Sequence, residues 1–105
     1  MQEVHFCSGS VFVTGDDIAM SLLKHVQAVA TARGSTVMTV PAVTMAGAPA
    51  SVTLMINAVS QISAGSVDRD GLELEDAAFV ARLDASTREI STSSVWLGVE
   101  DLSAA

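Results

Sequence analysis

The chain has 105 residues, half of them hydrophobic, and its 12 acidic and 5 basic side chains give a net charge of -7. This length predicts a single domain over residues 1–105, and such an apolar composition argues against intrinsic disorder. Binding to nucleic acid or to an anionic membrane surface requires clustered Lys and Arg, whereas the basic residues here are scattered along the chain. We therefore expect neither nucleic acid nor a membrane as a partner.

The cysteine content and the first residues indicate the compartment of the protein. Cys7 is the only cysteine, so no intramolecular disulfide can form. No apolar run is long enough to span a bilayer, and residues 1–5 lack the basic start and apolar middle of a signal peptide. We expect a cytoplasmic protein.

The first β-prone runs are residues 4–7 and 10–14, separated by Gly9 and its neighbouring serine. A glycine inside a strand pattern is typical of a bulge, whereas Ser-Gly also suits a tight hairpin turn. We favour one bulged strand, with the hairpin as the alternative.

A helix is predicted over residues 16–33, because apolar residues recur there with a period of 3.6. Those on the apolar face are Ile18, Ala19, Leu22, Leu23, Val26, Val29 and Ala30. Thr14 and Asp17 have the spacing of a capping box at its start. Gly34 suits the left-handed residue that ends many helices.

Two further strands are predicted over residues 36–44 and 51–59. Pro41 has no N–H for a strand ladder, which places the first of them at a sheet edge or at a bulge. In the second, apolar side chains recur at every other residue, so that one face of the strand carries Val52, Leu54, Ile56 and Ala58. Helical spacing also fits this segment, but its β-branched residues favour a strand.

Residues 68–71 are of types that favour a turn. Two interpretations of the following segment stay open. In the favoured one, Asp70 and Glu73 cap a helix over residues 72–85 that buries Leu72, Phe79, Val80 and Leu83. In the other, residues 79–83 form a strand that pairs with residues 90–97 across a hairpin. Both include a strand over residues 91–99 anchored by Trp96, and frayed residues from about 100.

The predicted fold is α+β in two layers. An antiparallel or mixed sheet of four to five strands packs on one or two helices. With a helix over residues 72–85 the order becomes βαββαβ, the ferredoxin-like arrangement. With the hairpin, one helix packs on a sheet of about five strands.

Candidate catalytic or metal-binding residues are few. His5 and Cys7 are two apart on a strand and point to one face, where they and His25 could ligate a metal ion or activate a thiolate. We favour a simpler interpretation, with a buried thiol beside a partly exposed His5, because free cysteine is among the most buried residue types. His25 lies at the margin of the apolar helix face, which suits a packed ring with a solvated tip.

Asp16 and Asp17 could supply paired carboxylates for acid–base work. Consecutive helical positions diverge by about 100°, so the two cannot share one small ion. Capping of the helix explains both residues more simply.

The sequence lacks the common phosphate-binding, nucleophile-elbow and metal-protease motifs, so we expect no cofactor. We expect a non-enzymatic, oligomeric α+β protein that binds a small ligand or a protein partner. No residue between positions 34 and 67 is ionisable, so we place the interface in the strand region that runs from Thr36 to Ile62.

Two alternatives are retained. The first is a small enzyme in which Cys7, His5 or His25 works with Asp16 or Asp17 as acid–base groups. The second is a metal-binding protein that uses the two histidines and the cysteine. The sequence does not identify the ligand or the partner.

Overall fold

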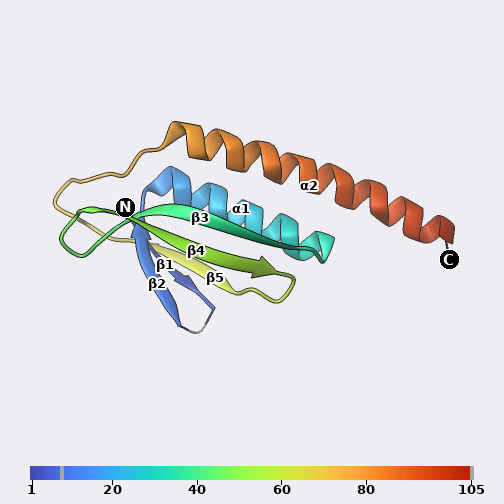
Figure 1. Cartoon of the computed structure of the whole chain (residues 1–105), viewed down its shortest axis with the longest axis horizontal. Coiled ribbons are helices and arrows are strands. Elements are labelled where there is room, and N and C mark those ends of the chain that lie inside the picture. The colour runs from blue at the N-terminus through green and yellow to red at the C-terminus, as the bar shows by residue number, and fades with distance from the viewer. Residues whose placement is uncertain (8, 105) are drawn as a thin grey trace.

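Five strands and two helices make up the described part of this computed structural model, which covers the backbone of residues 1–7 and 9–104 and the side chains of these residues up to Thr92. In chain order the elements are β1 (Gln2–Phe6), β2 (Ser10–Thr14), α1 (Asp16–Ala32), β3 (Ser35–Val43), β4 (Pro49–Asn57), β5 (Ile62–Ser66) and α2 (Ala77–Ala104). The strands form one antiparallel sheet in the order β4-β3-β2-β1-β5, and both helices lie on the same side of it (Figure 1). The predicted two-layer α+β class is confirmed.

The ferredoxin-like order βαββαβ is not confirmed, because the elements follow the order ββαβββα. Three differences account for this. The N-terminal β-prone segment folds into two strands, Ile62–Ser66 forms an additional strand that was not predicted, and the C-terminal segment remains helical where a final strand was expected.

The prediction of one bulged strand at the N-terminus is wrong, because β1 and β2 form an antiparallel hairpin in which Val4 pairs with Phe12. Cys7 adopts a left-handed conformation with φ of 55°, and the chain reverses after it. The hairpin lets both strands bury apolar side chains against the helices, including Val4, Phe6 and Phe12.

Helix α1 is confirmed within one residue, but the predicted capping box is wrong. The N-cap residue is Gly15, which has no side chain to accept a hydrogen bond from the first turn of the helix. The Thr14 hydroxyl donates instead to the Pro41 carbonyl oxygen at 2.7 Å. The Asp16 N–H donates to the Glu73 carboxylate at 2.8 Å, so the first turn is capped by a residue far along the chain.

The end of α1 is closed by the residue before the predicted glycine. Arg33 is the left-handed residue, with φ of 54°, and its N–H donates to Ala30 O at 3.1 Å. The Gly34 N–H donates to Val29 O at 3.1 Å. These two bonds form a Schellman motif.

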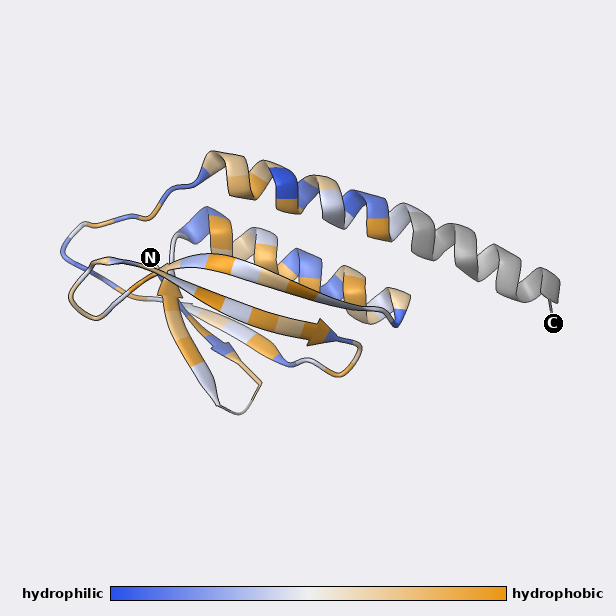
Figure 2. Ribbon diagram, in the orientation of Figure 1, coloured by the Kyte–Doolittle hydropathy of each residue, from blue (hydrophilic) through white to orange (hydrophobic). Residues whose placement is uncertain are grey.

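Strands β3 and β4 match the two predicted strands with shifts of one or two residues, and they pair along all nine residues of each. Ala58, expected on the buried face of the second strand, lies in the turn that follows it. Val40 and Leu54 face the helices and are buried, so the alternation continues across both strands (Figure 2). Among the described residues, β3 pairs with β2 through Val43 and Val13 alone, and Pro41 lies beyond that pair.

Helix α2 begins five residues later than predicted, at Ala77. Its cap is Asp76, whose carboxylate accepts the Phe79 N–H at 3.0 Å, so the proposed Asp70–Glu73 capping box is wrong. Asp70 and Gly71 instead have φ of 57° and 75°, in a tight turn closed by the Leu72 N–H to the Arg69 carbonyl oxygen. Two successive positive φ angles are typical of a type I′ turn, which asparagine, aspartate and glycine favour.

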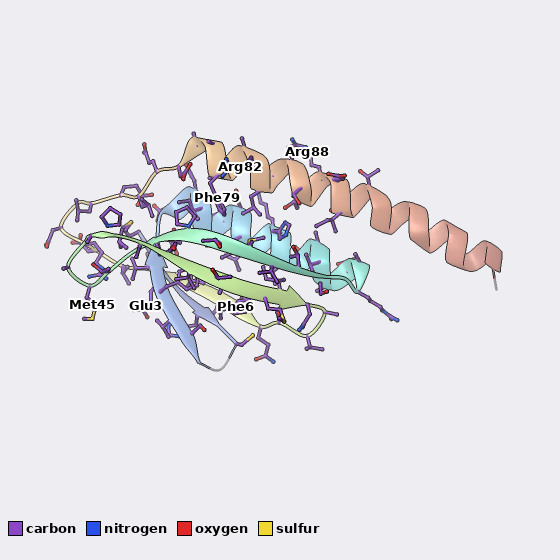
Figure 3. The ribbon with its side chains drawn as sticks, viewed as in Figure 1. Glu3, Phe6, Met45, Phe79, Arg82 and Arg88 are labelled. Atoms are coloured by element: carbon purple, nitrogen blue, oxygen red, sulfur yellow. The ribbon has the colours of Figure 1, made fainter. Side chains whose placement is uncertain are left out.

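The apolar contacts of α2 are partly those expected. Phe79 and Leu83 are buried and lie toward α1, as Figure 3 shows for Phe79, whereas Leu72 precedes the helix and is exposed. The hairpin alternative is wrong because the segment is helical.

The strand predicted over residues 91–99 is also wrong, since α2 continues to Ala104. No glycine or proline interrupts the segment between Ala77 and Leu97, so a helix started at the Asp76 cap can propagate through it. The side chain of Trp96 lies outside the described residues, and the fraying from about residue 100 stays a prediction.

The core lies between the sheet and α1, and α2 packs along α1. Its largest fully buried side chains include Ile18, Leu22, Ile56 and Val4. In the described part of the chain, neither helix is long and apolar enough to cross a membrane.

Candidate functional site

The strongest candidate surface is the outer face of the β3–β4 ribbon, meaning the side turned away from the helices. The Val37 and Met55 side chains pair across the two strands and are 62% and 67% exposed. Beside them, the Thr39 and Thr53 hydroxyls are 3.0 Å apart and hydrogen-bonded. Apolar and hydroxyl groups therefore cover this face.

The ribbon and its flanking turns carry no ionisable side chain, because residues 35–67 contain no Asp, Glu, Lys, Arg, His or Cys. The Met45 side chain projects from the β3–β4 turn and is 92% exposed (Figure 3). In a chain with a net charge of -7, an uncharged and partly apolar region of this length is unusual. Such a surface fits contact with another protein better than contact with water alone.

A second candidate lies on the same side of the sheet, over β1 and β5. The His5 Nε2 and the Glu3 carboxylate are 2.8 Å apart, and both side chains are about half exposed. Ser63 pairs with His5 across the strands, and Gly65 pairs with Glu3. Because glycine has no side chain, a shallow hollow of about 300 Å³ remains over this pair.

The structure separates the residues that were predicted to act together. His5 lies on the outer face of the sheet, whereas His25 is buried on α1 on the other side. Cys7 lies in the turn before β2, and Asp16 follows the opposite end of that strand. Among the described residues, no three His, Cys, Asp or Glu side chains form a group that could hold a metal ion.

Cys7 and His25 differ from their expected environments. Cys7 is exposed, so the expected buried thiol is wrong, because β1 ends at Phe6 and the alternation of the strand does not extend to the turn. His25 is 1% exposed, so its tip is not solvated. Helix α2 covers His25, and the periodicity of α1 alone does not show that a second helix packs there.

Asp16 takes part in a charged cluster at the N-terminus. Its carboxylate lies 3.0 Å from the Met1 amino group and accepts a hydrogen bond from the Gln2 amide, also at 3.0 Å. The Gln2 hydrogen bond and the amino group hold the pKa of the Asp16 carboxyl below its ordinary value. Glu73 lies 2.9 Å from the same amino group, whose pKa is raised by its hydrogen bonds to Glu73 and Asp16.

The contacts of this cluster hold three segments of the fold together. It joins β1, the start of α1 and the loop before α2, while Asp17 is exposed beside it. Sequence reasoning placed Glu73 in a capping box with Asp70 and missed its contact with α1, because nothing in the local pattern shows that a loop residue caps a helix 57 positions earlier. It missed Glu3 because a single acid in a strand has no distinctive spacing.

No protein family model, curated protein sequence or solved structure matches this chain.

Proposed function

We propose that this protein is a non-enzymatic binding module that self-associates through the β3–β4 ribbon. The observation that carries the proposal is the exposed Val37–Met55 pair on a ribbon that has no ionisable side chain. A cytoplasmic location and a small ligand or second protein as a further partner belong to the same proposal.

Electrostatics supports the choice of this surface. Two copies with a net charge of -7 each repel one another wherever their acidic side chains approach. The cores of protein–protein interfaces are depleted of charged residues and enriched in methionine and aromatic residues. The ribbon meets the first condition throughout its length and the second at Met55, so it allows association at the lowest electrostatic cost.

Light scattering coupled to size-exclusion chromatography tests the proposal. We expect a mass of at least twice 10.8 kDa at high chain concentration, and a shift toward a single chain for Thr53→Glu, because the new carboxylate on the exposed β4 strand faces its own copy across the interface. The matched control is Met20→Glu, which places the same charge on an exposed apolar residue of α1, outside the ribbon. A monomer at every concentration would contradict the proposal.

The Glu3–His5 pair favours a second candidate function, in which the hollow beside it binds a metal ion or supports acid–base chemistry. A hydrogen-bonded carboxylate orients an imidazole for either role. We expect this candidate to show a Zn²⁺-dependent rise in Tm that disappears in His5→Gln and persists in His25→Gln. A Tm that does not respond to Zn²⁺ or Cu²⁺ would count against the metal-binding form.

A further inference from the structure

The free edge of β4 has a defined pattern of backbone groups. The Thr44 N–H donates to Ala48 O at 2.9 Å, which shows that even-numbered residues of β3 and β4 bond to each other. The Pro41 carbonyl accepts the Thr14 hydroxyl, so odd-numbered residues of β3 point their backbone groups toward β2. Because N–H and C=O groups alternate sides along an antiparallel strand, odd-numbered residues of β4 point theirs toward the free edge.

Both ends of this edge are closed. Pro49 has no N–H to donate. Asn57 donates its N–H to the Ser60 hydroxyl at 2.9 Å and accepts the Ser60 N–H at 3.2 Å. The unpaired groups between them belong to Ser51, Thr53 and Met55, whose side chains are all exposed on the outer face.

This short edge is complementary to itself. Ser51, Thr53 and Met55 each offer one donor and one acceptor, arranged symmetrically about Thr53. Natural edge strands commonly carry lysine, other charges or bulges that prevent pairing with a second chain. Between its first-residue proline and Asn57, β4 carries no charge and pairs in continuous register with β3.

We propose that a second copy of this chain pairs with β4 edge to edge, antiparallel, with Thr53 opposite Thr53 of the second copy. Ser51 of each copy then lies opposite Met55 of the other, and three donors on each side give six hydrogen bonds in all. The two sheets join into one continuous sheet of ten strands. This inference rests on the proposed self-association and specifies its geometry: the contact lies along the β4 edge of the ribbon, with Met55 beside the second copy and Val37 one strand away from it.

A second copy fits this edge better than the other edge of the sheet. β5 has five residues against nine in β4, and its neighbour β1 places Glu3 on the outer face beside it. Pairing of β5 edges would bring two such carboxylates toward each other, whereas pairing of β4 edges brings together only Ser, Thr and Met side chains. An extended segment of another protein could use the same edge, and the test below separates the two occupants.

Amide hydrogen exchange on the purified full chain tests the geometry directly. The N–H groups of Ser51, Thr53 and Met55 should exchange roughly 15-fold more slowly at a chain concentration about 100 times the dissociation constant, where about 7% of the chains remain single, than at high dilution. Val37 and Thr39 are internal references, because their N–H groups face β2 where no strand pair forms among the described residues. They should exchange at the same rate in both conditions.

Thr53→Pro provides the matching variant. It removes the central donor of the edge without touching the ladder to β3, so the mass should fall from at least twice 10.8 kDa to 10.8 kDa with an unchanged far-UV circular dichroism spectrum. Thr53→Val retains the N–H and should stay associated. Ala64→Pro places proline on the β5 edge and should also stay associated.

The outcomes distinguish this inference from the function on which it rests. Association with unprotected Ser51, Thr53 and Met55 amides, or an associated and folded Thr53→Pro, would overturn the edge pairing and leave self-association standing. A wild-type monomer at every concentration would overturn both. Protection of these three amides that appears only on addition of another protein would overturn the second copy as the occupant. Should Thr53→Pro fail to fold, the exchange measurement on the unmodified chain decides alone.

Discussion

The imidazole of His25 is held in one tautomer by its neighbour on α2. The Thr87 hydroxyl donates to the Leu83 carbonyl oxygen at 2.9 Å, so its oxygen is free to accept from His25 Nδ1, also 2.9 Å away. The proton therefore resides on Nδ1. Nε2 is buried and has no hydrogen-bond partner among the described residues, which fits a neutral ring.

Burial lowers the pKa of His25, and this makes stability depend on pH. Below about pH 6.5 the unfolded chain binds a proton that the folded chain does not, so the free energy of unfolding should fall on acidification. Urea unfolding between about pH 7.5 and about pH 5.5 should show this loss, with a slope of up to about 1.4 kcal/mol per pH unit. His25→Leu should flatten it. Equal flattening by His5→Leu, on the exposed side of the sheet, would contradict the assignment.

Among the elements, the loop between β5 and α2 holds the molecule together at one end. Glu73 caps α1, and the Leu74 N–H donates to the Met1 sulfur at 3.2 Å, so the loop crosses close over the start of α1. Gly15 lies under this crossing. A Cβ at this position would overlap the carbonyl oxygen of Leu74, which explains why glycine stands at the N-cap.

Gly15→Ala should destabilise the fold by about 1–3 kcal/mol, because either the loop or the helix start must shift. Gly34→Ala is the matched control, since an added Cβ there meets no atom within 4 Å. Urea unfolding of both variants measures the difference. A loss for Gly15→Ala no greater than that for Gly34→Ala would show that the loop does not press on the helix.

The elements differ in how far the sequence predicts them. The periodicity of residues 16–33 and the alternation of β3 and β4 are local patterns, and both correspond to observed elements. The predicted start of α2 is wrong because Asp70 and Asp76 both suit a helix cap, and the packing of Phe79 and Leu83 against α1 favours the later one. The candidate site depends on contacts between distant segments, such as His25 with Thr87, which no local pattern contains.

For the whole molecule, the charge distribution should determine how association responds to salt. Each copy carries -7, while the ribbon proposed as the interface is uncharged. Added salt screens repulsion between the copies and breaks no ion pair at the contact. Sedimentation equilibrium should therefore show a several-fold lower dissociation constant at about 300 mM NaCl than at about 20 mM. Weaker association at high salt would indicate an interface built on ion pairs instead.

The single residue pair between β2 and β3 also bears on the order in which the chain folds. The β3–β4 ribbon closes through a short loop and needs little from the rest of the sheet, so we expect it to form early. β1 and β5 join residues about sixty positions apart and should pair late, because closing a long loop costs more entropy. The β4 edge is then complete while the sheet is still unfinished. Chain concentration should accordingly act on the folding reaction itself, with two copies able to meet before either has closed its sheet.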